Sequence, residues 1–160
     1  EITTRLVGSE MCIRDRLKLC PNGKVQGIDY SAVSVEKARK VNARAIAAGR
    51  CTVQQASVAE LPFKAEQFDV VTAFETVYFW PELAQNFREV YRVLKPGGVF
   101  FICNEANGET TKDDKWTQII NGMTIYTDTA LKAYLEQAGF CQIQSHKNKK
   151  GWLCVTAQKR

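Results

Sequence analysis

Residues 61–104 constrain the fold of this chain more than any other stretch. Two apolar runs, residues 68–74 and 99–104, flank a segment in which apolar side chains recur at spacings of four, three and four: Leu83, Phe87, Val90 and Leu94. That spacing places them on one stripe of an α-helix. Pro96 and the two glycines after it end such a helix, because proline cannot continue it and glycine tolerates a reversed backbone. A strand, a helix and a strand in this order predict a βαβ unit with parallel, buried strands.

Helices and strands are also predicted to alternate upstream of this unit. Residues 25–29 and 51–56 are apolar enough to form short strands. The helix between them is expected to begin at Ser31 or Ser34, since serine is a common N-cap, and to end at Gly49. Its predicted buried stripe consists of Ala38, Val41, Ala45 and Ala48.

Downstream, the pattern predicts a covering segment, a last helix and a hairpin. Residues 105–126 begin polar and then become too apolar for a linker, which indicates a partly helical flap carrying Trp116, Ile119 and Met123. Thr127 is the expected N-cap of a helix that buries Leu131, Leu135 and Ala138. Residues 140–146 and 152–157 are predicted to pair as an antiparallel hairpin. The whole chain of 160 residues therefore reads as one α/β domain with a doubly wound sheet.

Three short motifs in and around the central unit are familiar in combination. They are Leu-Pro-Phe at 61–63, Phe-Asp-Val-Val at 68–71 and Arg-Val-Leu-Lys-Pro-Gly-Gly at 92–98. Together and in this order, they resemble the class I S-adenosylmethionine (SAM)-dependent methyltransferases, from about Pro21 to the C-terminus. The resemblance implies a Rossmann-like sheet that ends in the antiparallel hairpin, SAM as cofactor, and methyl transfer to a small-molecule acceptor.

The first residues depart from that family. A class I methyltransferase opens with an apolar strand and a GxGxG turn, and its first strand lies between the strands that here end at Asp29 and Phe74. This chain has only Gly8 before Gly23, and residues 7–16 look like translated sequencing-adapter sequence. We therefore expect residues 1–16 to be non-native, residues 17–160 to be methyltransferase-like, and the first strand to be missing or degenerate. The open alternative is a divergent first strand over residues 2–7.

Parallel α/β sheets bind ligands beyond the carboxyl ends of their strands, which directs attention to the residues that follow each strand. Asp29 follows the second family strand, where an acid accepts hydrogen bonds from a ribose diol; a helix-entry residue facing water is the alternative. The resemblance also implies that Tyr30, Ser57 and Val58 contact the cofactor, although the family often has an aspartate where Ser57 stands. Gly27 is expected either to leave room for the cofactor or to serve packing.

Phe74 and Glu75 follow the next strand, and the resemblance places them near the sulfonium and its methyl group. Glu75 is a candidate catalytic or amine-binding residue, or else a solvated acid. An aromatic cluster follows, made of Tyr78, Phe79 and Trp80. One or two of these residues are expected to pack in the core, and the others to contact an apolar or cationic acceptor. Tyr78 is the second catalytic candidate. Asn104 and Trp116 complete the expected acceptor site.

Composition restricts the possible partners. The net charge of +5 comes from basic residues near the predicted hairpin tip and the C-terminus, where solvation explains them, so we expect no nucleic-acid partner. No apolar run approaches the ~20 residues of a membrane span, and no signal-peptide pattern opens the chain, so a cytoplasmic protein is expected. The six cysteines lack CxxC spacing, which argues against a metal site. The sequence does not specify the oligomeric state.

Three functions fit these patterns. The first is a SAM-dependent methyltransferase of small molecules. The second is a non-catalytic or truncated remnant of that fold, unable to hold SAM because the glycine-rich turn is missing. The third is a nicotinamide-dependent oxidoreductase, whose Rossmann sheet also places an acid after its second strand. The terminal hairpin and the Lys-Pro-Gly-Gly turn disfavour the third.

Overall fold

The structure is a computed structural model that describes residues 11–160, apart from the side chains of Met11, Cys12, Thr111, Lys112 and Asp114. The first half of the described chain forms, in order, α1 (Met11–Leu19), β1 (Val25–Asp29), α2 (Ala32–Val41), α3 (Ala43–Ala47) and β2 (Cys51–Gln55). The central βαβ unit follows as β3 (Phe68–Phe74), the 3-10 turn η1 (Val77–Phe79), α4 (Leu83–Val93) and β4 (Leu94–Asn104). The chain ends with α5 (Thr111–Ile119), α6 (Asp128–Gln137), β5 (Cys141–Lys147) and β6 (Leu153–Gln158).

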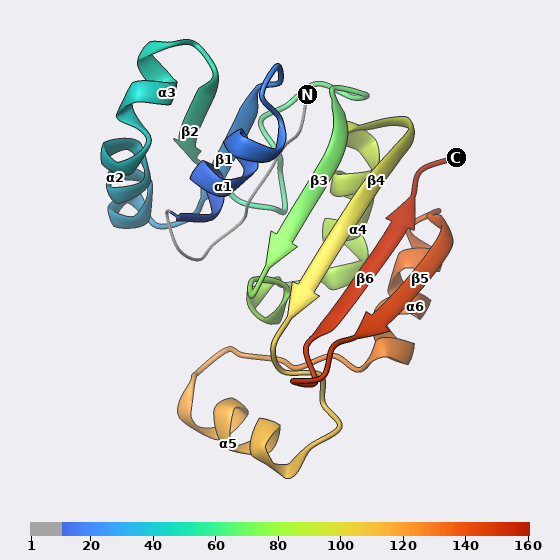
Figure 1. The fold of residues 1–160 in the computed structure, drawn as a ribbon. Helices are drawn as coiled ribbons and strands as arrows, with labels where there is room; N and C mark the ends of the chain where they lie inside the picture. Colours follow the sequence, from blue (N-terminus) through green and yellow to red (C-terminus); the bar gives the residue numbers. More distant parts are fainter. Residues whose placement is uncertain (1–10) are drawn as a thin grey trace.

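The strands form two sheets within the described residues (Figure 1). β1 and β2 pair in parallel, and β3, β4, β6 and β5 form the larger sheet in that spatial order. β3 and β4 are parallel, whereas β4 pairs with β6 and β6 with β5 in antiparallel register. Helices α4 and α6 lie together on one face of the larger sheet. This arrangement confirms the predicted α/β fold with its parallel central unit and terminal hairpin.

The break between the sheets falls where the missing strand was expected. Within residues 11–160, no strand lies between β1 and β3. Helix α1 bridges the two sheets instead, because the Arg16 Nε atom donates to the Thr72 hydroxyl of β3 at 3.0 Å. The Arg16 guanidinium also lies 4.1 Å from the centroid of the Phe74 ring, a cation–π distance. Residues 2–7 and Gly8, the candidates for a divergent first strand, lie outside the described residues.

Two apolar clusters form the core. The larger cluster lies between the larger sheet and helices α4 and α6, and its centre is aromatic: Phe87 packs against Trp80 and Phe100 with ring centroids 5.9 and 5.5 Å away. The smaller cluster joins α1 and α2 to β1 and β2 through residues such as Ile13, Leu17, Val25, Val35 and Val53. In the described part of the chain, none of the helices combines the length and apolar character that a membrane crossing requires.

Most predicted helix ends are confirmed. The Ser31 hydroxyl caps α2 by accepting from the Ser34 amide at 3.3 Å, and the Thr127 hydroxyl caps α6 by accepting from the Ala130 amide at 3.3 Å. Gly49 has a φ of +68°, which explains why glycine ends the α2–α3 segment.

Two details of the predicted helices are wrong. The first is the continuous helix of residues 32–48, because the chain breaks at Asn42, whose side-chain amide donates to the Ala38 carbonyl oxygen at 2.9 Å. The break leaves Val41 47% exposed and Ala48 exposed, and the buried row becomes Val35, Ala38 and Asn42. The second is Leu94, which is fully buried but belongs to β4 and pairs with Phe68, since α4 ends at Val93.

Candidate functional site

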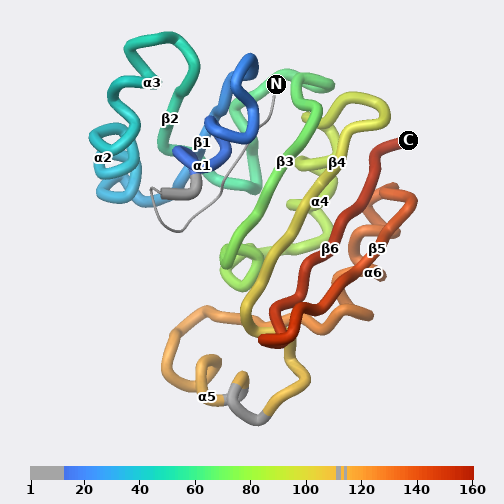
Figure 2. The backbone as a smooth tube through the Cα atoms, viewed as in Figure 1, coloured from blue at the N-terminus to red at the C-terminus, as the bar shows by residue number. Residues whose placement is uncertain are grey.

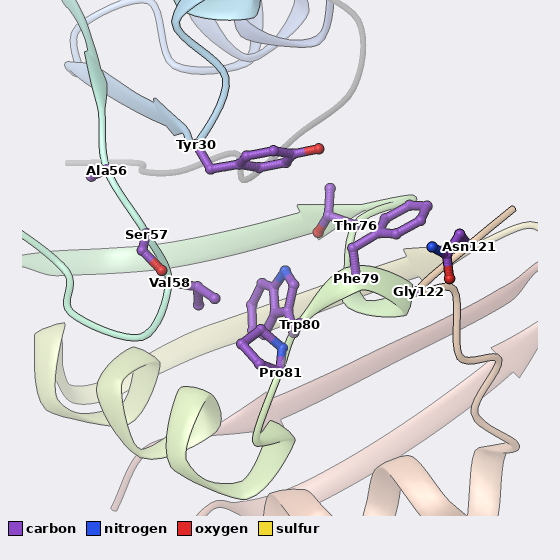
Figure 3. Close-up of a pocket in the computed structure, with 10 residues that line it drawn as sticks. All are labelled: Tyr30, Ala56, Ser57, Val58, Thr76, Phe79, Trp80, Pro81, Asn121 and Gly122. Atoms are coloured by element: carbon purple, nitrogen blue, oxygen red, sulfur yellow. The ribbon is translucent and has the colours of Figure 1, made fainter.

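Two adjoining cavities open beyond the carboxyl ends of the parallel strands. The first, called here the Tyr30 cavity, has a volume of about 300 Å³ and is drawn in Figure 3. Its lining residues come from four segments of the chain: Tyr30, Ala56, Ser57, Val58, Thr76, Phe79, Trp80, Pro81, Asn121 and Gly122. The second, called here the Glu75 cavity, has a volume of about 290 Å³. It is lined by Glu75, Tyr78, Phe79, Glu105, Ala106, Trp116, Ile120 and Met123, so Phe79 borders both cavities.

The ends of β1 and β2 position one side of the Tyr30 cavity. Asp29 is only 8% exposed, and one carboxylate oxygen accepts from the Ser31 amide at 2.8 Å. Tyr30 lies between Asp29 and Ser31, the N-cap of α2; it is 65% exposed and projects over the cavity opposite Val58 and Trp80 (Figure 3). The two strand ends are tied together, because the Gln55 side-chain amide donates to the Tyr30 carbonyl oxygen at 2.9 Å.

The end of β3 supplies a buried hydroxyl to the same cavity. Thr76 is fully buried and lines the Tyr30 cavity, and its Oγ1 atom has no hydrogen-bond partner among the described residues. A buried hydroxyl without a partner is costly, so such an atom at a cavity wall indicates a place for a polar ligand. Sequence reasoning missed Thr76; its position two residues after the end of β3 was the signal that could have found it.

Glu75 and Tyr78 lie on the other side of this turn, in the Glu75 cavity. Glu75 has a φ of +56°, and its carboxylate accepts a hydrogen bond from the Glu105 amide at the end of β4. Burial raises the pKa of Glu75, and the bond from Glu105 partly offsets that effect. The Tyr78 hydroxyl accepts from the Ala106 amide at 2.8 Å, and burial followed by the charge of Glu75 raises the pKa of Tyr78. Tyr78 is therefore a hydrogen-bonding group rather than a base at neutral pH.

Residues of the predicted flap line both cavities. Figure 2 traces residues 105–126, with helix α5, beyond the carboxyl ends of β3 and β4. The flap is attached to the site, because the Thr124 amide donates to the Tyr78 carbonyl oxygen at 2.8 Å. Trp116 is 51% exposed and lines the Glu75 cavity with Met123, whereas Ile119 is 73% exposed and lines neither cavity. Asn121 and Gly122, which sequence reasoning also missed, reach the Tyr30 cavity.

The structure thus brings most of the predicted site residues together. Tyr30, Ser57, Val58, Phe79 and Trp80 line the Tyr30 cavity, and Glu75, Tyr78, Phe79 and Trp116 line the Glu75 cavity.

Four predicted site residues line neither cavity. Asp29 lies directly before Tyr30, and Phe74 lies beneath the Arg16 guanidinium. Gly27 packs against α1, where an added Cβ would come within 2.9 Å of the Ile13 Cδ1 atom. Asn104 is fully buried, and neither polar atom of its side chain has a hydrogen-bond partner in the described part of the chain. In residues 11–160, no three His, Cys, Asp or Glu side chains are grouped to hold a metal ion.

Comparison with known sequences identifies the class of protein to which this fold and site belong. A family described as "Methyltransferase domain" matches residues 8–102, which is more than half of the chain. The chain therefore belongs to the methyltransferase domain family, and membership implies S-adenosylmethionine as the cofactor.

Two methyltransferases illustrate the similarity at the level of individual sequences. The chain is 35% identical to a demethylmenaquinone methyltransferase of Symbiobacterium thermophilum over 98 residues, or 61% of this chain and 39% of that protein. It is 31% identical to 24-methylenesterol C-methyltransferase 2 of Arabidopsis thaliana over 101 residues, or 62% of this chain and 28% of the relative. The chain thus spans well under half the length of these relatives.

A solved structure shares the fold across nearly the whole chain. The methyltransferase of Haloferax volcanii, solved in complex with the Trm112 methyltransferase activator, superposes with a TM-score of 0.84 at 18% identity. The superposition covers 99% of this chain and 82% of that one.

Proposed function

We propose that this chain is a SAM-dependent methyltransferase domain that acts on a small-molecule acceptor. The observation that carries the proposal is the Tyr30 cavity, which opens at the strand ends and contains the buried, unpartnered hydroxyl of Thr76. This is the place where open α/β sheets bind nucleotide cofactors. Similarity to a demethylmenaquinone methyltransferase and to a 24-methylenesterol C-methyltransferase supports a small organic acceptor.

The described residues fit the adenosine part of SAM. Asp29 would accept hydrogen bonds from the ribose diol, because a carboxylate has acceptor capacity beyond its bond to Ser31. Tyr30 and Val58 would enclose the adenine between an aromatic and an apolar wall, and Ser57 would contact its polar edge. When bound, SAM supplies a methyl group on a positively charged sulfur. The protein's own task is to position the acceptor against that methyl and to exclude water.

The second candidate function is a remnant of the same fold that no longer holds the cofactor. It is favoured by one observation, the separation of β1 from β3 within residues 11–160. The sequence before Gly23 has a single glycine where the family has a glycine-rich turn. Residues 1–16 are accordingly proposed to be non-native, and residues 17–160 to be the functional part of the domain.

Calorimetric titration of the unaltered chain distinguishes these candidates. A methyltransferase should bind both SAM and its demethylated product, S-adenosylhomocysteine. A remnant should bind neither, or only adenosine. Saturable binding of NAD without binding of SAM would contradict both and return the oxidoreductase to consideration.

Removing the Asp29 carboxylate is expected to weaken SAM binding by ~1.5–3 kcal/mol, the range for hydrogen bonds to charged groups. We suggest Asp29→Ala in a chimera whose residues 1–16 are replaced by a family-type first strand and turn, measured by titration. Asp29→Asn is the matched variant, because its side-chain oxygen can still accept from the Ser31 amide. Unchanged affinity in both variants would remove Asp29 from the site.

Trp116→Ala should raise the KM for the acceptor more than it weakens SAM binding, because Trp116 lines the Glu75 cavity and not the Tyr30 cavity. The measurement is steady-state kinetics of the same chimera with an identified acceptor. Ile119→Ala is the control, since Ile119 lies on the same helix but lines neither cavity. Equal effects of the two substitutions would show that α5 acts on folding and not on the acceptor.

A further inference from the structure

The Glu75 cavity has a charge opposite to that of the protein as a whole. The chain carries a net charge of +5, yet the residues lining this cavity include two glutamates, Glu75 and Glu105, and no lysine, arginine or histidine. A cleft lined by charges of one sign concentrates their field where its walls have a low dielectric constant. The cavity therefore attracts cations and disfavours anions.

Glu75 is held in a fixed position in that cavity. Its backbone lies in the left-handed region, and its carboxylate is bound by the Glu105 amide, which ties the end of β3 to the end of β4. A second tie runs between the same segments, because the Tyr78 hydroxyl accepts from the Ala106 amide. Glu75 is exposed as a residue, and partial burial of its carboxylate raises its pKa. A cation next to this carboxylate would favour its charged form.

The remaining walls are aromatic and apolar. Tyr78 and Phe79 meet edge to face with ring centroids 6.2 Å apart, and Trp116 borders the cavity from the flap. Ile120 and Met123 complete the apolar lining. Aromatic faces attract cations, and they also cover apolar carbon. This lining matches a molecule that has a positive group at one end and a hydrocarbon body.

We propose that the Glu75 cavity binds a protonated organic amine with an apolar or aromatic body. Because Phe79 borders both cavities, the bound amine lies next to the Tyr30 cavity. If the proposed methyltransferase function holds, this cavity is the acceptor site and the acceptor is an amine. The ammonium would first pass its proton to the Glu75 carboxylate, and the freed nitrogen lone pair would then bond to the methyl carbon of SAM as the S–C bond breaks and S-adenosylhomocysteine leaves. A neutral acceptor would form no ion pair with either glutamate of this cavity.

Direct binding tests this proposal without SAM. We suggest 2-phenylethylamine as the probe and 2-phenylethanol as its neutral counterpart, each titrated into the unaltered chain and followed by NMR. The amine is expected to bind about tenfold or more tightly than the alcohol, as hydrogen bonds to charged groups require. Glu75→Gln should remove most of that preference and leave alcohol binding within about twofold, since glutamine keeps the shape and the acceptor oxygen.

Two further variants keep the test conclusive if Glu75→Gln reduces stability. Glu105→Gln changes an exposed residue, so it should lower amine affinity in a folded protein even if Glu75→Gln reduces stability. Glu136→Gln, at an exposed position on α6 away from both cavities, should change nothing. Equal affinity for amine and alcohol, or an equal loss with Glu136→Gln, would overturn the proposal, as would displacement of the amine by millimolar magnesium or calcium. Failure of the chimera with a family-type first strand and turn to bind SAM would overturn the proposed function and leave the amine result unaffected.

Discussion

Replacing residues 1–16 with an apolar strand and a glycine-rich turn should tighten SAM binding by about 100-fold or more. Within residues 11–160, β1 and β3 belong to separate sheets, and α1 joins them through side chains such as Arg16. A strand inserted between them would form hydrogen bonds along both edges. The turn after it would add backbone amides for the carboxylate of the cofactor, and two such bonds at ~1.5–3 kcal/mol each account for the expected gain.

Glycine is needed in that turn for a geometrical reason. A residue without Cβ adopts left-handed conformations freely and lets the backbone approach the ligand closely. The present sequence has Gly8 followed by Ser9 and Glu10, so it offers one glycine and a carboxylate. A glutamate beside the carboxylate end of SAM would repel it. The unaltered chain is therefore expected to bind SAM weakly, and to gain stability when the first strand is supplied.

The measurements are calorimetric titration with SAM and urea denaturation of both proteins. A second chimera, with the same strand but alanine in place of each glycine of the turn, is the control. It should gain stability without gaining affinity, which separates the sheet from the turn. Tight SAM binding by the unaltered chain would contradict the prediction and would make Gly8 a cofactor-binding residue.

The sequence predicted the sheet well because its signals are local. The helical spacing of Leu83, Phe87 and Val90 depends on neighbouring residues only, and it appears in the structure. The predicted stop at Pro96 is wrong, because α4 ends at Val93 and Pro96 belongs to β4. The break at Asn42 was not predictable in this way. The break depends on one side chain, that of Asn42, which bonds to the preceding helical turn. It also changes which residues of the helix are buried, and the alanines of this segment gave no strong preference for one buried face.

The site residues also differ in how well local sequence signals predict their positions. Ser57 and Glu75, which the strand-end rule singled out, line the cavities, because parallel strands bring their carboxyl ends to one edge of the sheet. Asn104 satisfies the same rule, yet its side chain is buried in the fold. The direction of a side chain at a strand end depends on the pleat and on the following turn, which spacing does not specify. The division of the site into two cavities was not predictable, because it depends on the flap. Tertiary contacts, and not local sequence signals, hold the flap against the site.

Phe87→Ala is expected to cost ~3–5 kcal/mol of unfolding free energy, the range for truncating a buried phenylalanine. Phe87 is fully buried on α4, and its ring packs against Trp80 and Phe100. The cavity left behind is bounded by large rings and by a sheet, so it cannot close easily. The measurement is urea denaturation, with Phe101→Ala as the control, because Phe101 projects from the same strand as Phe100 and is only partly buried. Equal losses would contradict a core centred on α4.

This substitution should also affect ligand binding. Trp80 lines the Tyr30 cavity, and two rings hold it: Phe87 at 5.9 Å edge to face and Phe100 at 6.2 Å in a stacked arrangement. Removing Phe87 frees one side of the indole, so the cavity wall loses its fixed position before the domain unfolds. In a SAM-binding chimera kept folded at low temperature, Phe87→Ala should weaken SAM binding while Phe101→Ala leaves it unchanged. Undiminished affinity in the folded Phe87 variant would show that Phe100 alone is sufficient to position Trp80.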